Sequence, residues 1–306
     1  MERIERSVPS VDGIHSLYTV MYVPAGEVRG LVQLVHGMSE HIERYAPLMQ
    51  TLAENGFLAF GHDHVGHGKT ARDDGELGFI AHRGGYDVLI RDVGGVSDAV
   101  AREYPGKKRI LFGHSMGSFV VRLYAAVHSN ALSGLIVMGT GGPNPAAGVG
   151  LQLAKMIRGI RGEKHVSGLV DALAFGTYND RTEKKTVYDW LSTDLSSVKK
   201  YLEDPRCGFP FTVSAMCDLV TLNRNANRKE AYAQLRADLP VYLVAGAEDP
   251  VGAYGKGVSQ VAQAYRDAGL SNVSVKLYPG ARHEILNDFC KAEVATDLLD
   301  WIDRII

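Results

Sequence analysis

The sequence predicts an α/β fold in which a mostly parallel, doubly wound sheet carries a helical cap inserted near the middle of the chain. Short runs rich in apolar and β-branched residues alternate along the 306 residues with longer stretches of helical periodicity. Continuous apolar runs of this kind are typical of strands that are buried on both faces of a parallel sheet. One interval of about a hundred residues contains no clear strand, and this gap predicts the insertion.

The individual elements follow in the order expected of repeated βαβ units. The opening stretch HSLYTVMYVPAG, residues 15–26, predicts an antiparallel strand at one edge of the sheet. The predicted parallel strands are residues 30–36, 56–63, 109–114, 132–139, 240–246 and 273–280. The predicted helices are residues 44–55, 86–104, 116–128, 256–268 and 291–305.

The insertion begins at the cluster GTGGPNPAAGVG, whose glycines and prolines indicate an exit loop. We expect residues 143–211 to form the cap and residues 1–142 and 212–306 to form the core. The first cap helix carries Leu151 and Ile157 on an apolar face. This face would suit an acyl chain or a transient contact with a membrane, and ordinary packing of the cap on the core explains it equally well.

The composition is that of a globular protein and excludes several classes of partner. Apolar residues make up 45% and charged residues 22%, and the net charge of -2 provides no basic surface for nucleic acid. The apolar runs fall short of the roughly 20 residues needed to span a membrane, and MERIERSVPSVDG does not resemble a signal peptide. The three cysteines have no CxxC spacing, so we expect neither disulfides nor a zinc site and a cytoplasmic location.

Ser115 occupies the centre of GHSMG, residues 113–117, at the junction of a predicted strand and a predicted helix. The pattern G-x-S-x-G in this context is typical of a nucleophile elbow, a tight turn that exposes the serine hydroxyl. Glycines on both sides permit the turn, and the helix N-terminus would offer free N–H groups to a developing negative charge. We therefore expect Ser115 to be a catalytic nucleophile.

A base and an orienting acid for this serine follow later in the chain. Asp249 comes directly after the strand at 240–246, and His283 follows the next strand. Both positions lie at carboxyl ends of parallel strands, where open α/β sheets build their sites. The order serine, acid, histidine predicts a catalytic triad, with Glu248 and Asp288 as weaker alternatives for the acid.

Two backbone N–H groups are expected to form an oxyanion hole for this triad. One belongs to Met116, the residue after the nucleophile, and the other to Met38, in the turn after the strand at 30–36. Side-chain identity matters little at either position, because the backbone is the donor.

Other histidines near these motifs have simpler interpretations. His114 is expected to pack beneath the site. His62, His64 and His67 lie in the glycine-broken stretch GHDHVGHGKT, and their spacing matches no common zinc site, so we expect no metal and no cofactor.

Several motifs together resemble the α/β-hydrolase fold over nearly the whole chain. HGMSEHIERY, HDHVGHGKT, GHSMGS and GAEDPV are similar to motifs of the monoacylglycerol lipase and lysophospholipase family. This resemblance implies a serine hydrolase that cleaves carboxylic esters of single-chain lipids through an acyl-enzyme. It also implies that Glu40 and Arg44 bind the glycerol head group, although an i, i+4 salt bridge between them is the alternative.

The sequence departs from the family at two places and leaves other functions open. One is Ser118, at the end of the elbow, where the animal enzymes of the family have glycine. The family's lipases carry a second histidine three positions after the catalytic one, where this chain has Leu286. A short-chain carboxylesterase, an aminopeptidase or amide hydrolase, and a small-molecule receptor with a residual triad are the alternatives. An amine-binding site would need cap carboxylates, and the candidates are Asp189, Asp194, Glu203 and Asp204.

Overall fold

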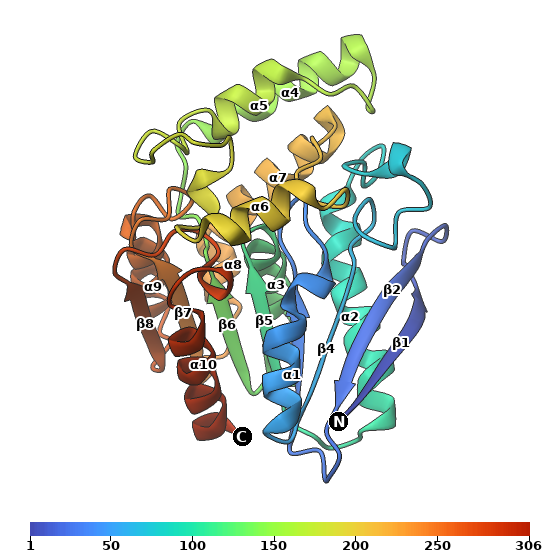
Figure 1. Cartoon of the computed structure of the whole chain (residues 1–306), viewed down its shortest axis with the longest axis vertical. Coiled ribbons are helices and arrows are strands. Elements are labelled where there is room, and N and C mark those ends of the chain that lie inside the picture. Colours follow the sequence, from blue (N-terminus) through green and yellow to red (C-terminus); the bar gives the residue numbers. More distant parts are fainter.

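Eight strands form one sheet with the order β1-β2-β4-β3-β5-β6-β7-β8 (Figure 1). This computed structural model describes residues 1–306. The six strands from β4 to β8 in this order are parallel, which confirms the predicted sheet. The strands are β1 Glu2–Pro9, β2 Ser16–Val23, β3 Gly30–Val35, β4 Phe57–His62, β5 Arg109–His114, β6 Gly134–Met138, β7 Val241–Gly246 and β8 Val273–Tyr278.

One prediction about the sheet is wrong. The stretch at 15–26 does form an antiparallel strand, β2, but β1 pairs outside it and takes the edge. From Arg3 to Pro9, β1 alternates exposed with partly buried residues, so it lacks the continuous apolar run that identified the inner strands. Alternation with period two is the pattern of a half-exposed antiparallel strand.

Helices cover both faces of the sheet. α1 and α10 pack on one face, and α2, α3 and α9 pack on the other. Along β3, Val32 and Leu34 point toward the first layer while Leu31 and Val35 point toward the second, as the strand period requires. The helices are α1 Ala46–Glu54, α2 Gly85–Glu103, α3 Met116–His128, α4 Ala147–Arg161, α5 Gly168–Phe175, α6 Leu195–Glu203, α7 Val213–Ala226, α8 Lys229–Ala233, α9 Lys256–Asp267 and α10 Lys291–Ile305.

The interval between β6 and β7 contains α4 to α8 and no strand of the sheet. Figure 1 shows α4, α5 and α6 lying beyond the carboxyl ends of the parallel strands. α7 contacts both α3 of the core and α4, so it joins the two layers. The extent of the cap, residues 143–211, stays a prediction. None of the helices combines the length and the apolar character needed to cross a membrane.

Candidate active site

Ser115 lies on the turn between β5 and α3 with φ 53° and ψ −119°, a conformation that L-residues rarely adopt. Its two flanking glycines explain how the chain makes this turn. A Cβ atom on Gly113 would collide with the carbonyl of Gly117, and a Cβ atom on Gly117 would collide with the carbonyl of Val35. The strained serine and the two obligatory glycines are the geometry of a nucleophile elbow.

Hydrogen bonds hold the elbow in place. The N–H of Ser115 donates to the carbonyl of Met138 on the neighbouring strand at 3.0 Å. The carbonyl of Ser115 accepts from the hydroxyl of Ser118 at 2.5 Å, and that hydroxyl also lies 2.8 Å from the hydroxyl of Thr140. Ser118 therefore braces the peptide that carries the nucleophile.

His283 and Asp249 meet at the same edge of the sheet, and both are buried. Nδ1 of His283 lies 3.0 Å from Oδ2 of Asp249, while Oδ1 of Asp249 accepts from the N–H of Val251 at 2.8 Å. Burial lowers the pKa of His283, but the charge and hydrogen bond of Asp249, together with the charges of Glu284 and Glu40, outweigh burial, so the net pKa is raised. The pair thus fixes the ring and favours its protonated form, with Nε2 left free.

The alternative acids are placed elsewhere. Glu248 is exposed on the turn after β7. Asp288 is buried, but its carboxylate accepts from the N–H groups of Arg282 and Thr193 and so holds a loop together. Neither carboxylate bonds to His283, whose partner is Asp249.

Met38 and Met116 both line a cavity with Ser115. Met116 is the first residue of α3, so its N–H is one of the unpaired donors at a helix N-terminus. The N–H of Met38 has no acceptor within the chain. A Cβ atom on Gly37 would lie 3.0 Å from Cβ of Ser115, which shows how closely this loop approaches the nucleophile.

His114 lies directly behind His283, with 4.7 Å between the ring centroids. Its Nδ1 is 2.7 Å from the hydroxyl of Tyr45 and 3.2 Å from Oε1 of Glu40. His114 was predicted only to pack beneath the site. It also links His283 to the buried carboxylate of Glu40.

Glu40 and Arg44 form the salt bridge that was the alternative to head-group binding, at 2.8 Å. Oε1 of Glu40 also accepts from the N–H of Gly37 at 2.6 Å and from the hydroxyl of Tyr45 at 2.8 Å. Arg44 donates to both oxygens of Glu284, at 2.5 and 2.6 Å. Burial would raise the pKa of Glu40, yet the bond from His114 and the charge of Arg44 hold that pKa well below its ordinary value.

These contacts correct part of the substrate-binding prediction. Glu40 lines the cavity, but its oxygens are already bonded within the protein. Arg44 does not line the cavity, because its guanidinium is turned toward the two carboxylates. Glu284 does line it, and sequence reasoning missed this residue although it directly follows His283.

The cavity has a volume of about 850 Å³ and extends from Ser115 to the inner surface of α4 and α5. Leu151 and Ile157, predicted to touch substrate, do not line it; they pack in the hydrophobic core beneath the cap. Their neighbours Leu153 and Ala154 do line it. The face of a cap helix that meets a ligand depends on how the helix docks, and periodicity alone does not decide it.

Trp190 is a second residue that sequence reasoning missed. Its ring centroid lies 5.2 Å from that of His283, and it lines the cavity from the loop before α6. The backbone N–H of Glu284 donates to the carbonyl of Leu191 at 2.7 Å, so this cap loop also holds the histidine loop. The chain has only two tryptophans, and this rarity is the one signal in the sequence that could have drawn attention to Trp190.

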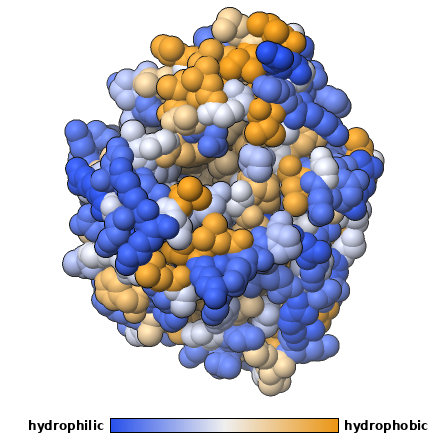
Figure 2. Space-filling model, turned by 45° about the horizontal axis from the view of Figure 1, so that its top comes forward, coloured by the Kyte–Doolittle hydropathy of each residue, from blue (hydrophilic) through white to orange (hydrophobic).

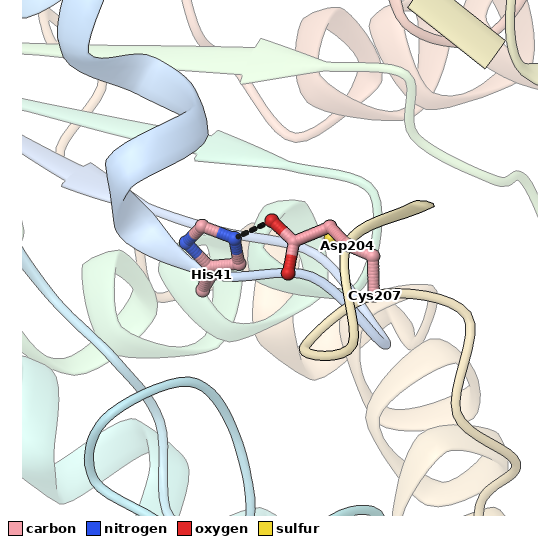
Figure 3. Close-up of side chains that lie close together, drawn as sticks. All are labelled: His41, Asp204 and Cys207. Carbon is pink, nitrogen blue, oxygen red and sulfur yellow. Dashed lines mark hydrogen bonds and ion pairs between the residues drawn. The ribbon is translucent and has the colours of Figure 1, made fainter. Parts of the chain in front are cut away.

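The four histidines His36, His62, His64 and His67 form a buried cluster in which the rings contact one another. Burial lowers the pKa of both His62 and His67 to about 4, so these rings are neutral near pH 7. Potential metal-ligand atoms converge in a different place, where those of His41, Asp204 and Cys207 all lie within 4.8 Å of one another (Figure 3).

A strained serine at an elbow, a buried His–Asp pair and a parallel sheet beneath them define an α/β-hydrolase of the serine type. Residues 26–289 match the model of the Hydrolase_4 family, described as serine aminopeptidase, S33. The chain belongs to this family.

Proteins named as lipases and esterases are similar to this chain over nearly its whole length. A monoacylglycerol lipase of Mycolicibacterium smegmatis is 27% identical over 98% of this chain and 97% of its own. The mouse monoglyceride lipase is 27% identical over 94% of this chain and 87% of its own. The structure of a thermostable carboxyl esterase from Bacillus coagulans, in complex with glycerol, is 35% identical, with a TM-score of 0.94 over 100% of this chain and 99% of that one. The protein is thus a carboxylic ester hydrolase.

Proposed function

We propose that the protein hydrolyses monoacylglycerols and similar single-chain lipid esters through an acyl-enzyme on Ser115. In this proposal His283 is the general base, Asp249 orients it, and the N–H groups of Met38 and Met116 form the oxyanion hole. One observation carries the proposal: the elbow serine and the Asp249-bound histidine open together into a large, mostly apolar cavity.

Acylation begins when Nε2 of His283 accepts the hydroxyl proton of Ser115 while Oγ attacks the ester carbonyl. The carbonyl oxygen becomes an oxyanion, which the two backbone N–H groups stabilise by hydrogen bonds. The resulting imidazolium is favoured by Asp249 at 3.0 Å and then donates its proton to the departing alcohol.

Deacylation repeats these steps with water as the nucleophile. His283 accepts a proton from water, the hydroxide adds to the acyl carbonyl, and the second tetrahedral intermediate collapses. The carboxylic acid leaves as Ser115 regains its proton from His283.

The cavity supports a substrate with one acyl chain. Its volume of about 850 Å³ falls in the range of pockets that enclose small-molecule ligands. Most of its lining is apolar and includes Leu153, Val170, Phe209, Met216 and Leu219. A single alkyl chain would gain hydrophobic stabilisation along this wall.

The glycerol complex of the related esterase supports a small polyol as the leaving group. The alcohol released from a monoacylglycerol is glycerol itself. In this chain the carboxylates of Glu40 and Glu284 line the cavity together with His283, and both are paired with Arg44. We propose that these two carboxylates, bridged by Arg44, border the head-group end of the cavity.

The outer surface of the cap supports contact with a lipid interface. Val149, Leu173 and Val187 line the cavity and are also 77%, 65% and 72% exposed, so they form an apolar rim at its mouth. Figure 2 shows hydrophobic side chains gathered around a hollow at the cap end of the molecule. We propose that this rim touches the lipid surface from which the substrate enters.

The four cap carboxylates named as candidates lend the amide-hydrolase alternative little support. None of the candidate carboxylates lines the cavity. Asp189 accepts from the N–H groups of Lys185 and Thr186, and Asp194 caps the N-terminus of α6. A substrate's free amine would therefore meet no unpaired carboxylate from this set.

Hydrolysis rates of the purified protein and of its Ser115→Ala variant would test the proposal. The substrates would be monoacylglycerols of graded chain length, a lysophospholipid, short p-nitrophenyl esters and an aminoacyl amide. We expect the highest kcat/KM on a monoacylglycerol and no turnover above background in the variant. A higher kcat/KM on the amide or on the short esters would contradict the substrate assignment.

A further inference from the structure

The residue that follows Met38 has an unusual backbone. Ser39 has φ 53°, in the left-handed region, although it is not a glycine. This region is sterically unfavourable for a residue with a Cβ atom, and it persists only where the surroundings enforce it. In this protein, hydrogen bonds with the cap hold Ser39 in this conformation.

Three hydrogen bonds tie Ser39 to the end of α6 and the loop after it. The carbonyl of Ser39 accepts from the hydroxyl of Tyr201 and from the N–H of Gly208, each at 2.9 Å. The hydroxyl of Ser39 donates to the carbonyl of Phe209 at 2.7 Å. Tyr201 is only 5% exposed, and the guanidinium of Arg44 packs over its ring at 4.9 Å from the centroid.

The same cap segment also contacts His41, two residues after Ser39. Figure 3 shows His41, from the loop before α1, facing the carboxylate of Asp204, with Nε2 and Oδ2 2.9 Å apart. Cys207 lies beside this pair and is buried. The loop that contains Met38 and the segment 201–209 are therefore joined at two successive points.

Met38 sits between two tethered neighbours. The N–H of Gly37 is held by Oε1 of Glu40 at 2.6 Å, and the carbonyl of Ser39 is held by the cap. The N–H of Met38 between them has no partner within the chain. The carbonyl of Gly37, which shares a peptide plane with this N–H, accepts from Nδ1 of His36 at 2.8 Å. The direction of the N–H is thus set by His36 and Glu40 on one side and by the cap on the other.

We propose that the cap holds the oxyanion hole in its active geometry through Ser39, and that Tyr201 is a positioning residue for the N–H of Met38. This inference rests on the proposed function, in which Met38 is an oxyanion donor. It assigns segment 201–209 a part in the chemical step, in addition to covering the substrate. A small misplacement of a catalytic group lowers the rate steeply, so the effect should be visible in kcat.

The test compares Tyr201→Phe with Tyr278→Phe as a matched control. Each substitution removes one buried hydroxyl that donates a hydrogen bond. The hydroxyl of Tyr201 donates to the carbonyl of Ser39, and the hydroxyl of Tyr278 donates to Oδ2 of Asp297, which is remote from the cavity. The measurements are kcat and KM on p-nitrophenyl butyrate, the Ki of a trifluoromethyl ketone that forms an oxyanion on the serine, and Tm.

For Tyr201→Phe we expect kcat to fall about tenfold, less than the 10²–10³ that follows loss of a whole oxyanion donor. KM should stay within about twofold, and the ketone Ki should rise in parallel with the fall in kcat/KM. Tyr278→Phe should lower Tm by a similar amount and leave kcat and Ki unchanged. Equal kcat for Tyr201→Phe and the wild type, or equal losses in both variants, would overturn the inference.

The Ser115→Ala variant separates this inference from the proposed function. Turnover that persists in Ser115→Ala would defeat the mechanism itself, whatever Tyr201 does. Loss of turnover in Ser115→Ala together with a wild-type kcat in Tyr201→Phe would leave the mechanism intact and remove only the role of the cap.

Discussion

Lowering the pH should destabilise the fold through the buried histidine cluster, and His62 offers the cleanest test. Both ring nitrogens of His62 are buried without a hydrogen-bond partner. Burial lowers its pKa from 6.5 to about 4. Between pH 6.5 and about pH 4, His62 is protonated in the unfolded chain and neutral in the folded protein. The free energy of unfolding therefore falls as the pH decreases from about 6.5 to about 4.

The size of this effect follows from the two pKa values. The gap between 6.5 and about 4, at about 1.36 kcal/mol for each pH unit, corresponds to about 3 kcal/mol for His62. Buried carboxyls act in the opposite direction, because burial raises the pKa of Asp63 and of Asp92 to about 6 and that of Asp218 to about 7. The pH profile of the wild type alone therefore mixes both signs.

A comparison of wild type with His62→Leu isolates the histidine. Leucine does not titrate, and the change breaks no hydrogen bond of the ring. The assay is urea unfolding followed by tryptophan fluorescence at several pH values from 7 to 4. We expect the variant to gain up to about 3 kcal/mol relative to wild type between pH 7 and pH 4.

A control separates titration from packing. Phe60→Leu alters a buried aromatic side chain two residues earlier in β4 and removes no titratable group, so its effect on stability should be independent of pH. A difference between wild type and His62→Leu that is equally independent of pH would refute the reasoning.

Three further predictions concern the site and the cap. Asp249→Asn should lower kcat by about 10⁴ while the circular dichroism spectrum stays unchanged, because the pair at 3.0 Å no longer stabilises the imidazolium; a loss below tenfold would exclude Asp249 as the orienting acid. Gly117→Ala should prevent the elbow from forming, because its Cβ would meet the carbonyl of Val35, so a normal Tm and fluorophosphonate labelling would contradict the stated packing. Ile160 on α4 is 74% exposed, and Ile160→Asp should lower the rate on monoacylglycerol dispersed in vesicles while leaving the rate on p-nitrophenyl butyrate unchanged. A wild-type rate of this variant on the vesicles would argue against lipid contact at this position.

The sheet could be predicted from the sequence because its inner strands are continuous apolar runs buried on both faces. β5 was predicted at its observed bounds, and so were α3 and α10. β1 was missed because its exposed and partly buried residues alternate, which leaves no continuous apolar run. A local pattern identifies an element only where burial makes the pattern strong.

The site was predictable as far as its residues lie in local motifs. The meeting of His283 with Asp249 follows from strand order, since both come after neighbouring parallel strands. The bond between Arg44 and Glu284 joins residues 240 positions apart in the sequence, so nothing local could reveal that Arg44 was already paired. The orientation of Leu151 depended in the same way on how α4 docks against α7.

Capture of the acyl-enzyme tests the central claim most directly. The protein would be mixed rapidly with p-nitrophenyl butyrate and quenched in acid, and its peptides would be analysed by mass spectrometry. We predict a butyryl group on Ser115 that appears within the first turnover and is absent from Ser115→Ala, which should also lose hydrolysis. An acyl group on another residue, or hydrolysis that continues in Ser115→Ala, would contradict the account.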